Sequence, residues 1–262
     1  MISARTRLCA VIGHPVGHSL SPEIHNAAFA AADVDYAYVA FDVEDAARAL
    51  EGAIALGIRG LSVTIPHKVA ALRALEELDG TIHPSAEDAG AINTVVNEGG
   101  RLVGYNTDGA GALDALLAAD VHPSRKPCVL LGAGGAARGI AFELLRHGGL
   151  KELWIVDVVP EKTAALVRDL GKVSSARITA SRPEDLEELL EGRVLLIHAT
   201  PVGMHPDDES SPLPARFLRR EHVVLDIVYT PLRTRLLRDA EAAGARAIPG
   251  VEMFVGQAAR QF

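Results

Sequence analysis

Four short polar segments interrupt the apolar first half of this 262-residue sequence, and they carry side chains that could do chemistry. They lie at residues 13–26, 60–68, 90–95 and 104–109. Hydroxyl, amide and carboxyl side chains hydrogen-bond a polar ligand, and a lysine among them is able to donate a proton. We single out Ser19, Ser21, Thr64, Lys68, Asn93 and Asp108. Together they predict a pocket for a polyhydroxylated acid.

Each of these residues also has an ordinary structural interpretation. Ser21 stands directly before Pro22, which is typical of a helix N-cap followed by the first helical residue. Asp108 is placed to cap the helix that it opens, and Asn93 to cap a helix or form a turn. Lys68 falls in the first turn of a predicted helix, where the helix dipole disfavours a positive charge. A residue placed against local preference is a candidate for function, although a single lysine is more often a surface residue.

A glycine-rich segment in the second half has the spacing of a dinucleotide-binding loop. It follows an apolar strand-like run and precedes a helical pattern at Arg138–His147. Gly132 permits a tight turn, Gly134 lets the backbone approach a pyrophosphate, and Ala137 lets the helix pack closely on the strand. The pyrophosphate then lies at a helix N-terminus, which favours an anion. The expected cofactor-binding residues of the loop are Gly132, Ala133, Gly134, Gly135 and Ala136. The alternative is a glycine turn that binds nothing.

An acidic residue ends the next predicted strand. Asp157 follows Glu152–Val156 and lies 25 residues after Gly132, near the offset of about 20 residues expected of a ribose-binding carboxylate. A carboxylate here accepts hydrogen bonds from ribose hydroxyls and repels a 2′-phosphate, and residues 158–160 supply no cation. We therefore expect NAD as the cofactor, with NADP as the alternative. The alternative is that Asp157 binds no cofactor and has only a structural role, at the start of the turn before the next helix.

Composition excludes several classes of protein. The chain is long enough for two domains, and 48% hydrophobic with 23% charged residues is typical of a folded protein. The 26 basic and 34 acidic residues give a net charge of −8, which argues against a nucleic-acid-binding surface. The apolar run from Leu8 stops at His14, too short for a signal peptide, and no stretch is long enough to span a membrane. Cys9 and Cys128 lie in apolar runs, and no Cys/His spacing indicates a metal site. We expect a cytoplasmic protein without a metal.

The elements that must position these residues alternate between strand-like and helical patterns. Strands are expected at Arg7–Ile12, Tyr36–Asp42 and Ile58–Val63, with helical segments between them. This alternation predicts βαβ units and a parallel sheet, whose strand carboxyl ends hold ligands. A hairpin is expected around residues 98–100, and a second βα series from Cys128 to about residue 243.

The motifs, taken in order, resemble the shikimate/quinate dehydrogenase family and span nearly the whole chain. The matching segments are 13–26, 63–68, 90–95, 106–108, 132–137, 199–204, 226–231 and 250–257. The resemblance implies an α/β fold with two domains. Residues 1–108 would form the substrate-binding and catalytic domain, completed by residues 244–262, whose C-terminal helix returns to it. Residues 109–243 would form a Rossmann NAD(P)-binding domain.

The resemblance also implies the roles of individual residues. Lys68 and Asp108 would be the catalytic pair. The substrate would be bound by Ser19, Ser21, Thr64, Asn93, Asp108, Tyr229 and Gln257. The nicotinamide side of the cofactor site would be lined by Thr200, Val228, Gly250 and Met253. Ser62 and His198 depart from the family, which usually has Asn at both positions.

The activity implied by the resemblance is the reversible NAD(P)-dependent reduction of 3-dehydroshikimate to shikimate in the chorismate pathway, with NAD preferred. Quinate/shikimate or aminoshikimate dehydrogenase is the closest alternative. A methylene-tetrahydrofolate dehydrogenase of similar build and a non-catalytic ligand-sensing module are further ones. The expected partners are shikimate, 3-dehydroshikimate and also quinate, with neither nucleic acid nor membrane. The protein is expected to be a monomer or a homodimer.

Overall fold

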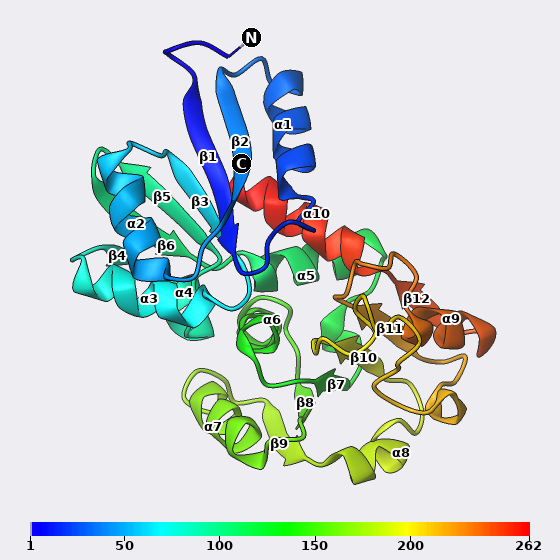
Figure 1. Ribbon diagram of the computed structural model, residues 1–262. Coiled ribbons are helices and arrows are strands. Elements are labelled where there is room, and N and C mark those ends of the chain that lie inside the picture. Colours follow the sequence, from blue (N-terminus) through cyan, green and yellow to red (C-terminus); the bar gives the residue numbers. More distant parts are fainter. Residues whose placement is uncertain (1) are drawn as a thin grey trace. The chain divides into compact units, whose positions relative to one another are not determined.

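The computed structural model describes residues 2–262, which form two compact units (Figure 1). The first unit runs up to Thr107 and includes Ala258–Phe262, and the second unit is Asp108–Gln257. The chain therefore leaves the first unit after Thr107 and returns to it inside the last helix, α10 (Gly250–Gln261). The domain division at residues 108 and 244 stays a prediction, because compactness alone does not define a domain.

The first unit is built on a mixed six-stranded sheet with the order β2-β1-β3-β5-β6-β4. Its strands are β1 (Arg7–Gly13), β2 (Tyr36–Asp42), β3 (Gly60–Val63), β4 (Thr81–Ile82), β5 (Thr94–Glu98) and β6 (Arg101–Tyr105). Its helices are α1 (Ser21–Ala31), α2 (Ala46–Ala55), α3 (Lys68–Glu77) and α4 (Pro84–Ala89). β1 pairs in parallel with β2 and β3, whereas β5 runs antiparallel to β3 and β6. The parallel group and the β5–β6 hairpin agree with the sequence pattern, and β4 and α4 were not expected.

Apolar side chains cover both faces of this first sheet. Ile12, Leu50 and Leu75 belong to a buried cluster that joins the sheet to α2 and α3. Val11, next to Ile12 on β1, packs instead in a second cluster with Phe29 of α1. Successive strand residues point to opposite faces of a sheet, so α1 and the α2–α3 pair cover opposite faces.

The second unit is a parallel six-stranded sheet with the order β12-β11-β10-β7-β8-β9. Its strands are β7 (Cys128–Leu131), β8 (Glu152–Val156), β9 (Arg177–Ser181), β10 (Leu195–His198), β11 (Val223–Asp226) and β12 (Arg246–Ile248). Its other helices are α5 (Asp108–Ala118), α6 (Gly135–Arg146), α7 (Pro160–Leu170), α8 (Leu186–Leu189) and α9 (Arg235–Ala242), with short 3-10 turns at Pro123–Arg125, Pro183–Asp185 and Ala215–Phe217.

The strand order of this second sheet reverses at β7. From β7 the chain proceeds to β8 and β9 on one side, and it then returns to β10 on the other side. Such a switch point leaves a crevice at the carboxyl ends of the two central strands, where dinucleotides bind in doubly wound folds. The predicted α/β class with a Rossmann-type unit is confirmed.

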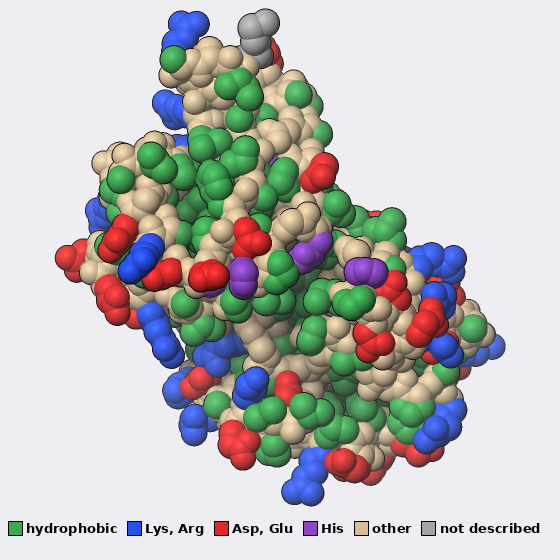
Figure 2. Space-filling model, in the orientation of Figure 1, with side chains coloured by type: hydrophobic (Ala, Val, Ile, Leu, Met, Phe, Trp, Pro, Cys, Tyr) green, Lys and Arg blue, Asp and Glu red, His purple; other side chains and the backbone are tan. Residues whose placement is uncertain are grey.

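The surface carries charges of both signs. On the face drawn in Figure 2, Lys and Arg side chains lie interspersed with Asp and Glu. Within residues 2–262, no helix combines the length and the apolar composition that crossing a membrane requires. The same residues hold no group of three or more His, Cys, Asp or Glu side chains arranged to bind a metal ion. Cys128 is buried as expected, whereas Cys9 is only partly buried, and both are free thiols.

Candidate active site and dinucleotide-binding site

The predicted polar segments of the first unit meet at one edge of its sheet. β1 and β3 are parallel neighbours, so the loops that follow them leave from the same edge. These loops pack tightly, because a Cβ added to Gly13 would lie 2.5 Å from Cγ2 of Thr64. Asn93 precedes the antiparallel strand β5 and therefore lies at the same edge, where its carbonyl oxygen accepts a hydrogen bond from the Val63 N–H at 2.8 Å. The fold thus gathers the serine loop, Thr64 and Asn93.

Asn93 is held in one orientation by its neighbours. Its side chain is buried, and Nδ2 donates to Oγ1 of Thr107 at 2.9 Å. Oδ1 accepts from the Thr107 N–H at 2.9 Å and from the Thr94 hydroxyl at 2.7 Å. Asn93 therefore ties the start of β5 to the segment that follows β6, and its amide is preorganised at the candidate site.

Ser21 does not act as the N-cap that its position before a proline suggests. The helix α1 begins at Ser21 itself, and the preceding Leu20 makes no side-chain cap hydrogen bond. Ser21 is buried, and its hydroxyl oxygen accepts a hydrogen bond from the Ser19 hydroxyl at 3.2 Å. The backbone N–H of Ser21 donates to Oγ of Ser19 at 3.3 Å. Two hydroxyls therefore lie together at a helix N-terminus whose N-cap residue, Leu20, offers no side-chain acceptor, a suitable place for a carboxylate.

Lys68 is the first residue of α3, so it lies in the first turn of a helix, as its sequence position indicates. The turn that carries Lys68 is anchored by His67, which is buried. Nε2 of His67 lies 2.7 Å from the carbonyl oxygen of Val43, and its backbone N–H donates to the Thr64 carbonyl oxygen at 2.9 Å. His67 thus orients the segment between two predicted site residues, a role that the sequence analysis did not find.

Ser62 belongs to a buried hydroxyl network in the first unit. The Tyr38 hydroxyl donates to Oγ of Ser62 at 2.5 Å, and the Ser62 hydroxyl donates to Oε1 of Gln261 at 2.6 Å. Burial raises the pKa of the Tyr38 hydroxyl above its usual range. These three residues line a cavity of about 300 Å³ within the first unit. Tyr38 and Gln261 are functional candidates that sequence reasoning missed, because their partners are far away along the chain.

The glycine loop of the second unit has the geometry that a dinucleotide requires. Gly132 has a φ of +109°, and a Cβ at this position would lie 2.7 Å from the Ala199 carbonyl oxygen, so glycine is required. At Gly134, an added Cβ would meet no atom within 4 Å, so this side of the loop is open to a ligand. The helix α6 begins at Gly135 without a side-chain cap, which leaves its N-terminus suitable for a pyrophosphate.

Asp157 lies against this loop, directly after β8. Its Oδ2 accepts a hydrogen bond from the Ala133 N–H at 2.8 Å, and its Oδ1 accepts one from the Val159 N–H at 2.9 Å. The first contact places the carboxylate beside the glycine loop, where a ribose lies in dinucleotide folds. The second contact organises the turn before α7, so the structural interpretation of Asp157 also holds.

Thr200 lies on the other side of the switch point, after β10. A Cβ on Gly132 would approach Cγ2 of Thr200 to 3.1 Å, so Thr200 packs against the glycine loop. Nε2 of His198 lies 2.6 Å from Oγ1 of Thr200, and Nδ1 of His198 lies 2.9 Å from Oδ1 of Asp226. His198 and Asp226 are both fully buried. Sequence reasoning noted His198 only as a departure from the family, and it did not find Asp226.

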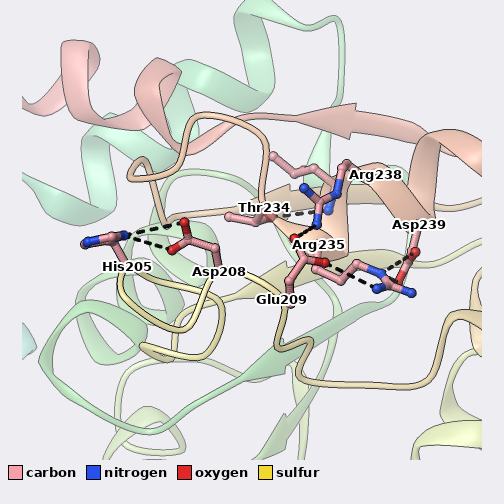
Figure 3. Close-up of polar contacts among 8 residues, drawn as sticks. His205, Asp208, Glu209, Thr234, Arg235, Arg238 and Asp239 are labelled. Carbon is pink, nitrogen blue, oxygen red and sulfur yellow. Dashed lines mark hydrogen bonds and ion pairs between the residues drawn. The ribbon is translucent and has the colours of Figure 1, made fainter.

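The loop that follows Thr200 is tied to α9 by ion pairs (Figure 3). Glu209 accepts a hydrogen bond from Nη2 of Arg238 at 2.7 Å and lies 3.5 Å from Nη1 of Arg235. Nε of Arg235 also donates to Oδ1 of Asp239 at 2.9 Å. The Arg238 hydrogen bond lowers the pKa of the Glu209 carboxyl. Because these side chains are exposed, the pairs orient the loop and add little to stability.

The remaining predicted residues all lie in the second unit. They are Asp108, Val228, Tyr229, Gly250, Met253 and Gln257. Gly250 packs so closely that an added Cβ would lie 2.5 Å from the carbonyl oxygen of Val228. Tyr229 stacks on Phe254 with ring centroids 4.5 Å apart, and burial raises the pKa of its hydroxyl. Lys68 belongs to the first unit and Asp108 to the second, and their catalytic pairing stays a prediction.

A doubly wound unit with a dinucleotide loop, joined to a second α/β unit with a polar strand edge, is the architecture of a dinucleotide-dependent enzyme. Comparison with known proteins identifies the family. The sequence profile of the shikimate dehydrogenase substrate binding domain matches residues 11–95, and that of the saccharopine dehydrogenase NADP binding domain matches residues 128–208. A protein named shikimate dehydrogenase (NADP(+)) from Thermococcus kodakarensis is 44% identical over 264 residues, which cover 100% of this chain and 92% of that protein.

Solved structures agree with this assignment. Shikimate 5-dehydrogenase from Listeria monocytogenes, in complex with shikimate and NAD, is 36% identical with a TM-score of 0.89 and covers 99% of this chain and 91% of that one. Quinate dehydrogenase from Corynebacterium glutamicum, in complex with NAD, is 28% identical with a TM-score of 0.87 and covers 98% of this chain and 92% of that one. The chain belongs to the shikimate dehydrogenase family, and it is an NAD(P)-dependent oxidoreductase that acts on a CH–OH group.

Proposed function

We propose that this protein catalyses the reversible reduction of 3-dehydroshikimate to shikimate. The observation that carries the proposal is the convergence of the Ser19–Ser21 pair, Thr64 and Asn93 at one edge of the first sheet, with Lys68 on the helix that follows. Hydroxyl, amide and ammonium groups complement the hydroxyls and the carboxylate of a polyhydroxylated ring acid. The Listeria relative, which was solved with shikimate, supports the same substrate.

In the proposed reaction, each of these residues has a separate role. The nicotinamide, when bound, exchanges a hydride with the ring carbon that carries the reacting oxygen. In the reducing direction this oxygen gains negative charge, which the Lys68 ammonium stabilises while it donates the proton. Asp108 is proposed to orient Lys68 and to accept a hydrogen bond from the hydroxyl of the alcohol form of the substrate. The paired hydroxyls of Ser19 and Ser21, at the N-terminus of α1, hold the substrate carboxylate.

NAD is the cofactor that we propose, on the basis of Asp157. Its carboxylate lies against the Ala133 N–H and is placed to accept hydrogen bonds from ribose hydroxyls and to repel a 2′-phosphate. Residues 158–160 supply no cation to bind that phosphate. The names of the curated relatives point instead to NADP, as for the Thermococcus protein, whereas the Listeria structure holds NAD. The preference therefore depends on this one residue and needs its own test.

The cofactor proposal is tested by the ratio of kcat/KM for NAD to that for NADP. Asp157→Asn removes the charge and keeps the shape, and it is expected to shift the ratio toward NADP by about tenfold or more, since juxtaposed like charges cost several kcal/mol. Glu161→Gln removes an exposed charge from the first turn of α7 and serves as the matched control. A wild-type preference for NADP, or a ratio that Asp157→Asn leaves unchanged, would contradict the proposal.

The reaction itself is tested by incubating the protein with shikimate or quinate and either NAD or NADP. The absorbance of the reduced nicotinamide reports turnover. Faster turnover of shikimate than of quinate supports the proposal. Faster turnover of quinate would contradict it and would indicate a quinate dehydrogenase instead. No turnover by a protein that melts cooperatively would point to a ligand-sensing module.

The proposal extends to the setting of the enzyme. Both cysteines are free thiols, which fits the cytoplasm, where disulfides are rare. We expect a monomer or a homodimer, and sedimentation of the purified protein distinguishes the two.

A further inference from the structure

A chain of polar side chains lies behind Thr200 in the second unit and has no part in the mechanism above. The Thr234 hydroxyl donates to Oδ2 of Asp226 at 2.6 Å, and Oδ1 of Asp226 lies 2.9 Å from Nδ1 of His198. Nε2 of His198 lies 2.6 Å from Oγ1 of Thr200. Thr234, Asp226 and His198 are buried, and Thr200 is partly exposed. The chain therefore leads from the interior of the unit to one accessible hydroxyl.

The positions of the protons along this chain follow from Asp226. An ionised carboxylate only accepts hydrogen bonds, and this one faces the Thr234 hydroxyl, the Val228 N–H at 3.0 Å and Nδ1 of His198. Nδ1 therefore carries a proton. In the arrangement proposed below, His198 is a neutral imidazole whose other nitrogen is an acceptor, so the Thr200 hydroxyl donates to Nε2. A buried carboxylate sets the histidine tautomer in the same way in Ser-His-Asp triads.

This arrangement decides what Thr200 offers to a ligand. A hydroxyl has one proton and two lone pairs. The proton is directed at His198, and one lone pair faces the Val202 N–H at 3.3 Å. The remaining lone pair makes Thr200 an acceptor toward a ligand. An amide side chain at position 198 would have both a donor and an acceptor group at its tip, so it would not determine the direction of the Thr200 proton.

The topology places this acceptor beside one half of the dinucleotide. β10 adjoins β7 on the side opposite β8, and Thr200 packs against Gly132 at the switch point. The end of β8, with Asp157, lies on the side that receives the adenosine ribose. A residue after β10 therefore faces the nicotinamide half. That half carries hydrogen-bond donors, namely the carboxamide N–H groups and the ribose hydroxyls.

We propose that Asp226 and His198 are positioning residues that make the Thr200 hydroxyl an obligate acceptor for a donor on the nicotinamide half of the cofactor. The proposal rests on the dinucleotide binding assumed in the proposed function and deepens it. It makes His198 a determinant of how this chain orients its cofactor.

The first test measures the His198 tautomer in the cofactor-free protein. Nitrogen-15 NMR of the imidazole rings, assigned by the signals that disappear in His198→Phe, is expected to show a protonated Nδ1 and an unprotonated Nε2. A doubly protonated ring, or a proton on Nε2, would overturn the proposal. This result does not depend on any catalytic activity.

The second test measures binding by calorimetry with NAD, with ADP, and with 3-acetylpyridine adenine dinucleotide, which lacks the carboxamide N–H groups. Thr200→Val keeps the shape and removes the hydroxyl, so NAD affinity should fall about three- to tenfold while the affinity for ADP, which lacks the whole nicotinamide half, stays constant. Thr200→Ser should restore NAD binding. Thr163→Val removes another buried hydroxyl of the same unit, which lies 3.4 Å from the Val159 carbonyl oxygen, and should change neither affinity.

The analogue identifies the donor. If the carboxamide is the donor, the wild type binds the analogue more weakly than NAD, and Thr200→Val removes this difference. If a ribose hydroxyl is the donor, Thr200→Val weakens both ligands equally, which also supports the proposal. Equal NAD affinity in wild type and Thr200→Val would overturn this inference alone. A wild type that binds neither NAD nor NADP would overturn the proposed function, and this inference with it.

Discussion

Two glycines of the cofactor loop differ in what a methyl group would meet, and this difference separates folding from binding. At Gly132 the φ is +109°, and an added Cβ would lie 2.7 Å from the Ala199 carbonyl oxygen. At Gly134 the φ is −78°, and the added Cβ would meet nothing within 4 Å. Gly132→Ala should therefore damage the fold, whereas Gly134→Ala should leave the fold intact and obstruct the pyrophosphate.

The magnitudes follow from these geometries. A side chain forced into the left-handed region at Gly132 costs about 1–3 kcal/mol, and a domain of 150–250 residues loses about 2–4 °C in Tm per kcal/mol. Gly132→Ala is therefore expected to lower Tm by roughly 2–12 °C. Gly134→Ala restricts only the unfolded chain, so it should stabilise by about 0.4–1 kcal/mol. Its methyl group occupies the space through which the pyrophosphate reaches the backbone, so NAD affinity should fall about tenfold or more.

Scanning calorimetry gives Tm, and titration calorimetry with NAD and NADP gives affinity. Gly52→Ala is the control, because Gly52 lies in helix α2 of the first unit and an added Cβ there meets nothing within 4 Å. It should match Gly134→Ala in stability and the wild type in affinity. Wild-type affinity in Gly134→Ala would refute the assignment of this loop as the pyrophosphate site.

Three further predictions concern single groups. Lys68→Ala should lower turnover with shikimate about a hundredfold or more at unchanged Tm; near-normal turnover removes Lys68 from its proposed role. The Asp42 hydrogen bond, at 2.6 Å, raises the pKa of His14 above the ordinary 6.5, so the stability that this pair contributes is present at low pH and is lost as pH rises through the raised value. In NMR titrations, Asp42→Asn should return the His14 midpoint toward 6.5, and an unmoved midpoint would contradict this cause. Burial raises the pKa of Cys9 to about 11 and that of Cys128 further, so roughly one Cys9 thiol in a thousand is ionised at pH 8. Iodoacetamide should label the native protein slowly, and rapid labelling at pH 8 would rule out this burial.

The parts of the fold that sequence reasoning predicted correctly depend on local pattern. A strand, a glycine loop and a helix follow one another around Gly132, and the acid that ends the next strand, Asp157, lies at a regular offset. The two-residue strand β4 was missed, because two residues show no periodicity. The capping alternative for Ser21 is wrong because the start of α1 depends on the conformation of Leu20, which a Ser-Pro pair does not reveal.

Contacts between distant residues could not be predicted in the same way. From the sequence, Ser62 was interpreted only as a departure from the family's asparagine. In the structure it forms hydrogen bonds with Tyr38, 24 residues away, and with Gln261, 199 residues away. His198 was likewise interpreted only as a departure from the family. The positioning role that we propose for it depends on its contact with Asp226, 28 residues away. Such partners are chosen by sheet order and helix packing, which a single sequence does not specify residue by residue.

The last helix has a consequence for the order in which the chain can fold. The second unit, Asp108–Gln257, is continuous in sequence. The first unit is not, because it includes Ala258–Phe262, which follow the second unit in the sequence. Domains usually fold in the order in which the ribosome releases them, N-terminal first. Here the first unit cannot close its Ser62–Gln261 hydrogen bond until the second unit has been synthesised, so the second unit is able to complete its contacts first. Loss of the last few residues should therefore weaken the part of the protein that is translated earliest.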